Sequence, residues 1–175
     1  MAQQAAIERD SEQACFVALL DRHRGIVFKV AATYCAHPED RRDLAQEIST
    51  QLWRAFPKYD ATRSFSTWMY RIALNVAISS LRRGAPQRNT QALDENWLES
   101  VAEGPAPEPD DRILLLRRLI DQLDDLNRAL LLLYLDEKTY REIAEVLGIT
   151  ETNVATKLNR LKQRIRDGVN DVRPD

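Results

Sequence analysis

The stretch TYREIAEVLGIT, residues 139–150, decides the fold of the C-terminal part of this chain. Thr139 and Glu142 stand at capping-box spacing, in which the hydroxyl and the carboxylate each accept a hydrogen bond from a backbone N–H of the first helical turn. Gly148 can take the left-handed conformation that ends a helix, and Thr150 can then cap a second helix. Two helices joined by so short a turn predict a helix-turn-helix.

The second helix of this motif has one apolar face and one polar, basic face. Its inward positions are Val154, Leu158, Leu161 and Ile165, and residues 151–166 include five basic side chains against one acidic. Thr, Asn, Lys and Arg near the start of such a helix can meet base edges, and later Arg and Lys can hold phosphates. The alternative is a helical hairpin with a solvated basic face. Because the capping box, the glycine and the charge bias coincide, we favour DNA binding. The outward set is Thr152, Asn153, Thr156, Lys157, Asn159, Arg160, Lys162, Arg164 and Arg166.

Charge divides the rest of the chain. Lys plus Arg number 25 against 27 Asp plus Glu in 175 residues, for a formal net charge of −2. Residues 91–111 hold seven acidic side chains and no Lys or Arg, and four of the seven prolines lie in or beside them. A helix cannot continue through such a segment, so it predicts an acidic, Pro-containing linker over 85–111, between domains at 1–84 and 112–175. Outside residues 91–111 the net charge is +5.

Composition excludes several classes of protein. A hydrophobic fraction of 44% with three Trp excludes an intrinsically disordered chain, and only five Gly argue against an all-β fold. No segment alternates as a half-buried strand, so we expect an all-α protein of two small helical domains. Cys15 and Cys35, with two His, suit neither a disulfide framework nor an evident zinc site, which predicts buried thiols and no metal or other cofactor.

The sequence shows no targeting segment, membrane-spanning segment or catalytic motif, and we base our expectations about localisation and enzyme activity on this. The chain shows no signal peptide, and its longest apolar run, residues 129–135, is too short to cross a bilayer. We therefore expect a cytoplasmic protein without membrane insertion. It has no Gly-rich phosphate loop and no evident nucleophile, so we expect no enzyme activity.

Hydrophobic spacing predicts helices in both domains. In the first domain they cover residues 11–37, 38–56 and 65–83, with a short loop before the third. In the second domain, residues 113–123 form one helix and the segment beginning at Leu126 forms the next. The run Leu130–Leu135 predicts a central helix that is buried on every side.

The segment from Phe56 to Asn75 interleaves aromatic and basic side chains next to a loop. Single-stranded nucleic acid binding requires this combination, because bases stack on rings while cations hold phosphates. The alternative is that Phe65 and Trp68 are core residues of the third helix. Taken by itself, the segment favours that alternative.

The second helix carries a different surface. Asp43, Gln46 and Glu47 lie within about one turn and flank the inward positions Leu44 and Ile48. DNA would repel such an acidic and amide patch, so it predicts a protein partner. The alternative is a solvated helix face.

Several of these runs are together recognisable. RDLAQE (42–47), LWRAF (52–56) and FSTWMYRIA (65–73) resemble region two of a bacterial RNA polymerase sigma factor, and YREIA (140–144) with LGI (147–149) resembles region four. With only these two regions and a short linker, the chain is most similar to the extracytoplasmic-function group.

The resemblance implies three binding surfaces. The clamp helices of the polymerase beta-prime subunit would meet Asp43, Leu44, Gln46 and Glu47. The melted non-template strand of the minus-ten promoter element would meet Tyr59, Arg63, Phe65, Trp68, Arg71, Asn75 and Arg82. The duplex minus-thirty-five element would meet Thr150, Thr152, Asn153, Thr156, Lys157, Arg160 and Arg164. The beta subunit is a further implied partner, and an anti-sigma factor is common in the group, although no residue here identifies one.

Three positions depart from the family pattern. Ser79 replaces a usual acidic residue near the end of the third helix, Ala155 replaces a frequent basic one, and Asn159 stands where His or another polar residue is common. A competing interpretation is a helix-turn-helix regulator that binds a palindrome as a dimer without polymerase. A helical adaptor without a DNA role is a third, which the basic helix disfavours.

Overall fold

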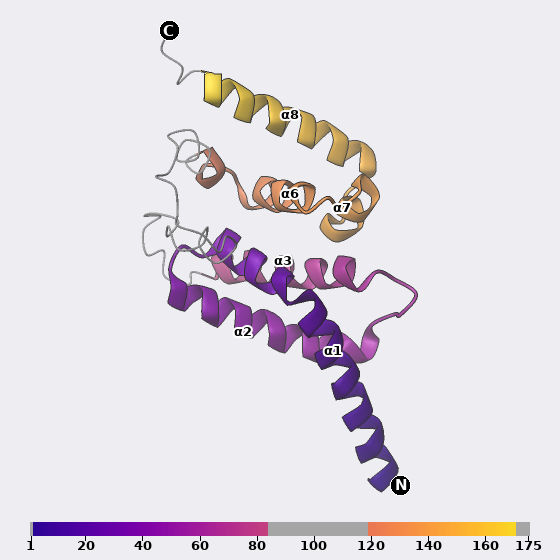
Figure 1. The fold of residues 1–175 in the computed structure, drawn as a ribbon. Coiled ribbons are helices and arrows are strands. Elements are labelled where there is room, and N and C mark those ends of the chain that lie inside the picture. The colour runs from indigo at the N-terminus through magenta and orange to yellow at the C-terminus, as the bar shows by residue number, and fades with distance from the viewer. Residues whose placement is uncertain (1, 84–118, 171–175) are drawn as a thin grey trace, which may run out of the picture.

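The computed structural model describes residues 2–83 and 119–170, and the first of these ranges forms a bundle of helices (Figure 1). Its elements are α1 (Ala2–Tyr34), α2 (Pro38–Ala55), the short 3-10 helix η1 (Phe56–Lys58) and α3 (Phe65–Arg82). The expected start of the first helix at Ser11 was wrong, because α1 begins nine residues earlier. Residues 2–10, AQQAAIERD, consist mostly of good helix formers, and they extend the helix away from the bundle.

The breaks between these helices have local causes. Pro38 occupies the first turn of α2, where its missing N–H leaves no hydrogen bond unmade. Ser64 caps α3 by accepting a hydrogen bond from the backbone N–H of Thr67 at 3.5 Å. The bundle core is made of fully buried side chains from all three α-helices, among them Val30, Ile48, Leu52, Met69, Tyr70 and Ala73.

The C-terminal range contains α6 (Asp125–Leu135), α7 (Tyr140–Leu147) and α8 (Glu151–Asn170). Both halves of the predicted capping box are present, because Thr139 accepts from the N–H of Glu142 and Glu142 accepts from the N–H of Thr139. Gly148 ends α7 at φ +67°, and Thr150 accepts from the N–H of Asn153 at 3.2 Å. The prediction of a helix-turn-helix is confirmed.

Two expectations about burial were wrong. In the run Leu130–Leu135, Leu130 and Leu133 are fully buried but Leu135 is 67% exposed, because α8 and the bundle cover only part of α6. Cys15 is exposed, because it lies on the side of α1 that faces away from the core although the next residue, Phe16, is buried in it, and Cys35 is half-buried at the edge of the core. Burial raises the pKa of the Cys35 thiol.

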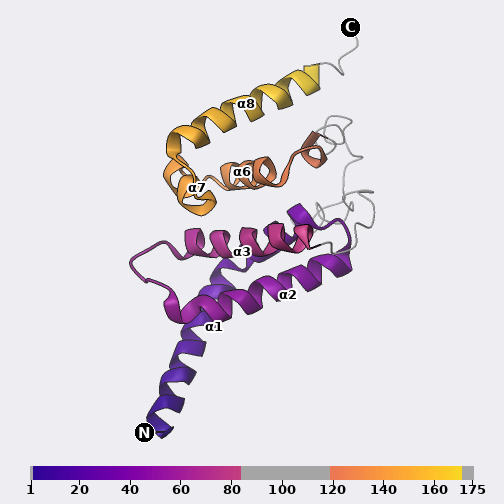
Figure 2. The same cartoon turned by 180° about the vertical axis from the view of Figure 1, so that it is seen from behind.

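The two halves pack against each other. In both views α3 lies beside α6 and α7, and α8 lies beyond them on the side away from α2 (Figures 1 and 2). One hydrophobic cluster runs from Phe16 of α1 to Leu161 of α8. Residues 2–83 and 119–170 contain no strand, so the all-α prediction is confirmed. Within those residues no helix is long and apolar enough to span a bilayer. The same residues contain no group of three or more His, Cys, Asp or Glu side chains that could hold a metal ion.

Candidate polymerase and nucleic-acid interfaces

The outer face of α8 is the first candidate interface. Val154, Leu158 and Leu161 are buried against α6 and α7, which turns the opposite face of the helix to solvent. The predicted minus-thirty-five set lies on that face: Thr150, Thr152, Asn153, Thr156, Arg160 and Arg164 are exposed, and Lys157 is half-buried. Lys162 does not belong with them, because its Nζ lies 4.1 Å from the centre of the Tyr134 ring of α6. The exposed set can reach a DNA groove without moving any core residue.

The predicted minus-ten loop is organised around an aromatic cluster. The Tyr59 ring centre lies 5.0 Å from that of Trp68 and 5.3 Å from that of Phe65, and the Phe65 and Trp68 centres lie 5.2 Å apart. Phe65 is buried, whereas Tyr59 and Trp68 are half-buried. Phe65 is therefore the buried ring on which Tyr59 and Trp68 pack, and in this conformation it has no exposed face on which a base could stack.

Hydrogen bonds hold the loop itself. The Tyr59 hydroxyl donates to the carbonyl of Arg63 at 2.7 Å. Asp60 accepts from both the N–H and the hydroxyl of Thr62, and these bonds lower the pKa of its carboxyl. The loop is thus a preformed turn in which the backbone of Arg63 is tied to the Tyr59 hydroxyl.

One face of α3 remains in solvent. Arg71, Asn75 and Arg82, at spacings of four and seven residues, share this face and are all exposed. Two cations and an amide in a row suit phosphates and base edges. Ser79 accepts the N–H of Arg83 at 3.2 Å, so the position that departs from the family pattern closes the end of the helix through its carbonyl.

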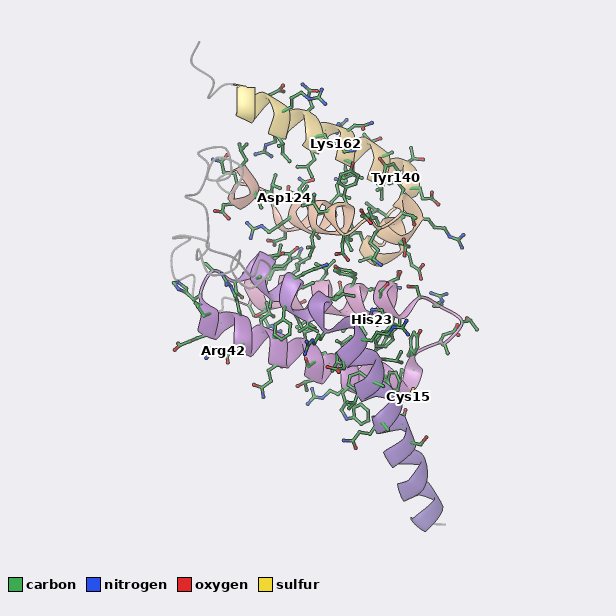
Figure 3. All side chains as sticks on the ribbon, in the orientation of Figure 1. Cys15, His23, Arg42, Asp124, Tyr140 and Lys162 are labelled. Atoms are coloured by element: carbon green, nitrogen blue, oxygen red, sulfur yellow. The ribbon has the colours of Figure 1, made fainter. Side chains whose placement is uncertain are left out.

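The acidic and amide patch of α2 is exposed as predicted. Asp43, Gln46 and Glu47 are exposed, but Leu44 is 6% exposed and packs into the bundle core. Gln51 donates to Glu47 at 2.8 Å across one turn, which fixes the carboxylate at the surface. In Figure 3, Arg42 beside this patch lies on the side of the molecule opposite to Tyr140 and Lys162.

Contacts between the two halves involve side chains that sequence reasoning did not assign. Lys138 donates to the Ser66 hydroxyl at 2.8 Å, and the Thr67 hydroxyl donates to Glu142 at 3.3 Å. Arg63, a predicted minus-ten residue, is paired with Glu145 of α7 at 3.2 Å. These partners are 72 to 82 residues apart in the chain, so no local pattern could have joined them.

Comparisons with known proteins agree with this geometry. The model described as Sigma-70 region 2 matches residues 19–86, and that described as Sigma-70, region 4 matches residues 113–165. The chain is 28% identical to the ECF RNA polymerase sigma factor SigW of Bacillus subtilis over 94% of both chains. It is also 28% identical to the ECF RNA polymerase sigma-E factor of Escherichia coli K12, over 95% of this chain and 93% of the relative.

Two solved structures have the same fold. CnrH, in complex with the cytosolic domain of CnrY, matches with a TM-score of 0.67 and 21% identity over 92% of this chain and 91% of that one. The sigma factor RpoE from Bartonella quintana, in complex with the anti-sigma factor NepR, matches with a TM-score of 0.61 and 14% identity over 94% and 99%.

Proposed function

The chain belongs to the extracytoplasmic-function group of RNA polymerase sigma factors, with sigma-70 regions 2 and 4, and from this premise we propose how its surfaces are used. Sigma factors are non-enzymatic polymerase subunits, so the chain acts in transcription initiation by binding. We assign region 2 to residues 1–84 and region 4 to residues 112–175. The proposed linker, 85–111, lies outside the described residues.

The exposed patch of α2 is the proposed docking surface for the clamp helices of the beta-prime subunit. Asp43, Gln46 and Glu47 offer carboxylate and amide groups to a partner that presents cations or donors. Leu44 contributes from below by anchoring this helix face in the core. Region 4 supplies a second attachment, which we assign to the beta subunit.

The loop and the exposed face of α3 are proposed to hold the melted non-template strand of the minus-ten element. Tyr59 and Trp68 supply half-buried ring faces, while Arg63, Arg71 and Arg82 supply positive charge. Stacking an unpaired base is worth about 1–3 kcal/mol, which offsets part of the cost of opening the duplex. We assign Phe65 to the support of the two rings, and Asn75 to contact with a base edge.

The outer face of α8 is proposed to read the minus-thirty-five element as duplex. Thr150, Thr152 and Asn153 lie at the start of the helix, where recognition helices meet base edges. Arg160 and Arg164 lie one or more turns later and suit phosphates. The remaining members of the proposed set are Thr156 and Lys157.

Regulation by an anti-sigma factor is part of the proposal. One structural relative was solved in complex with the anti-sigma factor NepR. A partner of this kind would have to cover the α2 patch or the DNA-binding faces to block initiation. Because the polymerase and the promoter are cytoplasmic in bacteria, we assign the protein to that compartment.

The observation that supports this function most strongly is the helix-turn-helix of α7 and α8 joined in one chain to the region 2 bundle. Run-off transcription with purified core polymerase on a genomic library tests it. We expect promoter-specific transcripts that depend on the protein. Active core and soluble protein without such transcripts would refute the proposal, and a stable dimer that protects a palindrome without polymerase would support the regulator alternative.

A further inference from the structure

A hollow of about 300 Å³ lies where the middle of α1, the first turn of α3 and the turn after α6 meet. Its lining, among the described residues, is polar and mostly cationic. The charged groups are three cations against one carboxylate, for a net charge of +2 while the imidazole of His23 is neutral. Charge of one sign around a hollow raises the local concentration of ions of the opposite sign, so this lining favours an anion. The charged side chains are Arg22, Lys29, Lys138 and Asp136.

Hydrogen bonds and ion pairs fix the wall of this hollow. The Asp136 carboxylate accepts the hydroxyl of the fully buried Tyr70 at 2.8 Å with one oxygen and pairs with Lys29 through the other. Burial and the bond to Asp136 raise the pKa of Tyr70, so its hydroxyl stays a donor. Lys138 donates to the Ser66 hydroxyl at 2.8 Å, and its ammonium group has further donors for a ligand. The two lysines are therefore held in place before any ligand arrives, which lowers the entropy cost of binding.

Arg22 is the cation that these bonds leave free. It is exposed, and it forms no hydrogen bond or ion pair with another residue of 2–83 or 119–170. Its guanidinium stays charged at physiological pH and presents its N–H donors in a planar fork that suits an oxyanion. The next cation on the helix, Arg24, lies 4.0 Å from Asp21 and does not line the hollow. Arg22 is therefore the group best placed to hold an anion.

The environment of His23 supports a positive potential in the hollow. Its ring lines the hollow, and the ring centre lies 5.4 Å from that of Phe65, where α1 passes the start of α3 (Figure 3). Burial lowers the pKa of His23, and the positive charges of Arg22 and Lys138 lower it further. The imidazole is therefore a neutral hydrogen-bonding group, and an anion beside it would shift its pKa back upward.

Gly25 leaves space in the lining. It lies inside α1, where glycine is less favourable than alanine, and a Cβ built there would meet no atom within 4 Å. Packing among the described residues therefore does not demand a glycine at this position. A longer side chain would take up part of the hollow, so a substitution here blocks the hollow without removing a charge.

The occupant that fits this hollow is small. Small-molecule sites measure about 300–1,000 Å³, and this hollow lies at the lower limit. Carboxylates stand around it, because Asp21 and Glu137 are exposed beside lining residues and Glu142 lies 3.8 Å from the Nζ of Lys138. An extended nucleic-acid backbone would meet this negative charge outside the hollow, whereas a compact anion would not.

We propose that this hollow is a binding site for a small molecule that carries a phosphate or diphosphate group, with Arg22 and Lys138 as its charged ligands. The Ser66 hydroxyl and the His23 ring are neutral hydrogen-bonding groups of the same lining. None of these four residues belongs to the proposed polymerase or DNA surfaces. The inference is independent of the proposed function, because binding requires neither polymerase nor promoter.

Isothermal titration calorimetry of the full-length protein with pyrophosphate tests this site. The wild type should bind, and Arg22→Ala should bind about tenfold more weakly, because it removes charge-assisted hydrogen bonds to the anion. Gly25→Leu keeps every cation and should weaken binding by a similar factor, because the new side chain occupies the hollow. Arg24→Ala is the matched control, since it removes the same charge from the same helix outside the hollow, and it should bind like the wild type.

Proton NMR locates the bound anion, because the chain has two histidines. Pyrophosphate should shift the ring signals of His23, which lines the hollow, and should raise the pKa of that ring. The ring signals of His37, at the start of α2, should stay in place. Shifts of His37 without shifts of His23 would contradict the proposed location.

Three calorimetric results would overturn the inference. The first is a folded wild type that does not bind pyrophosphate. The second is equal weakening by Arg22→Ala and Arg24→Ala, which would indicate a nonspecific effect of charge. The third is a single-stranded oligothymidylate that binds more tightly than pyrophosphate and loses this affinity in Arg22→Ala, which would assign the hollow to nucleic acid. Circular dichroism reports whether each variant is folded; if Gly25→Leu is not, Arg22→Ala decides, since Arg22 is exposed and its substitution removes no core contact.

Discussion

Two glycines in this chain should respond to the same substitution with opposite signs. Gly25 lies within α1 and Gly148 ends α7 at φ +67°, and a Cβ added at either position would meet no atom within 4 Å. Steric clash is therefore excluded at both sites, and only the backbone conformation differs. Gly25→Ala should stabilise the protein by about 0.5–1 kcal/mol, because glycine within a helix costs that much relative to alanine.

Gly148→Ala should destabilise the protein instead. The left-handed conformation costs an alanine about 1–2 kcal/mol, and the smaller entropy of the unfolded chain returns about 0.4–1 kcal/mol of this. The net loss is about 1 kcal/mol. For a chain of this size, a change of about 1 kcal/mol moves the melting temperature by about 2–4 °C, so the two variants should lie on opposite sides of the wild type.

Thermal melts followed by circular dichroism, with urea midpoints as an independent measure, test this pair. Gly148→Asn is the rescue control, because asparagine tolerates the left-handed region better than alanine. It should recover part of the loss. A Gly148→Ala protein as stable as the wild type would refute the positive-φ argument, and a destabilised Gly25→Ala would show that α1 is not helical at that point.

Three further outcomes are expected. Glu142→Gln keeps the capping box but removes the charge. Burial alone would raise the pKa of Glu142, but the hydrogen bonds from Thr139 and the charge of Lys138 lower it below 4.5. The wild type should therefore be more stable than the variant above pH 4.5. That advantage should vanish as the pH falls through the lowered pKa, and a pH-independent difference in urea midpoint would contradict it. Arg71→Ala should reduce promoter opening, measured by permanganate footprinting, about tenfold without changing the affinity for core polymerase. Arg54→Ala on α2 should change neither quantity. Equal effects of the two substitutions would indicate a nonspecific effect of positive charge. Reversal of the patch by Gln46→Lys with Glu47→Lys should weaken core binding at least tenfold, against Asp21→Lys as control, and unchanged affinity would exclude the patch.

Features encoded within a few residues could be predicted from the sequence. The capping box of Thr139 and Glu142 and the left-handed Gly148 depend on neighbours three or four residues away, and each was found as expected. The start of α1 was missed because residues 2–10 have helical composition without an apolar stripe that would mark a packed face. The burial of Leu135 was misjudged because an apolar run does not show which of its faces another helix will cover.

The residues of the candidate site also fall into two groups, those that the sequence predicts and those that depend on tertiary packing. Arg71, Asn75 and Gln46 are exposed, as the binding roles implied by the family resemblance require. The burial of Phe65 and the pairing of Arg63 with Glu145 depend on tertiary packing, which joins residues 82 apart in the second case. Asp136 has no local signature at all, because its partners come from two helices of the other domain.

The charge of α7 gives a reason why this pairing is specific. In a helix-turn-helix the first helix crosses the DNA backbone, where cations are favoured. On α7 the apolar Ile143, Ala144 and Val146 face the core, and Glu142 and Glu145 make polar contacts with the other half of the chain. Phosphates repel these carboxylates, so this edge of α7 is better suited to a protein surface than to DNA. Arg63 and Thr67 of the N-terminal half occupy that edge in this structure, so a partner that binds the same edge of α7 must first displace these two side chains.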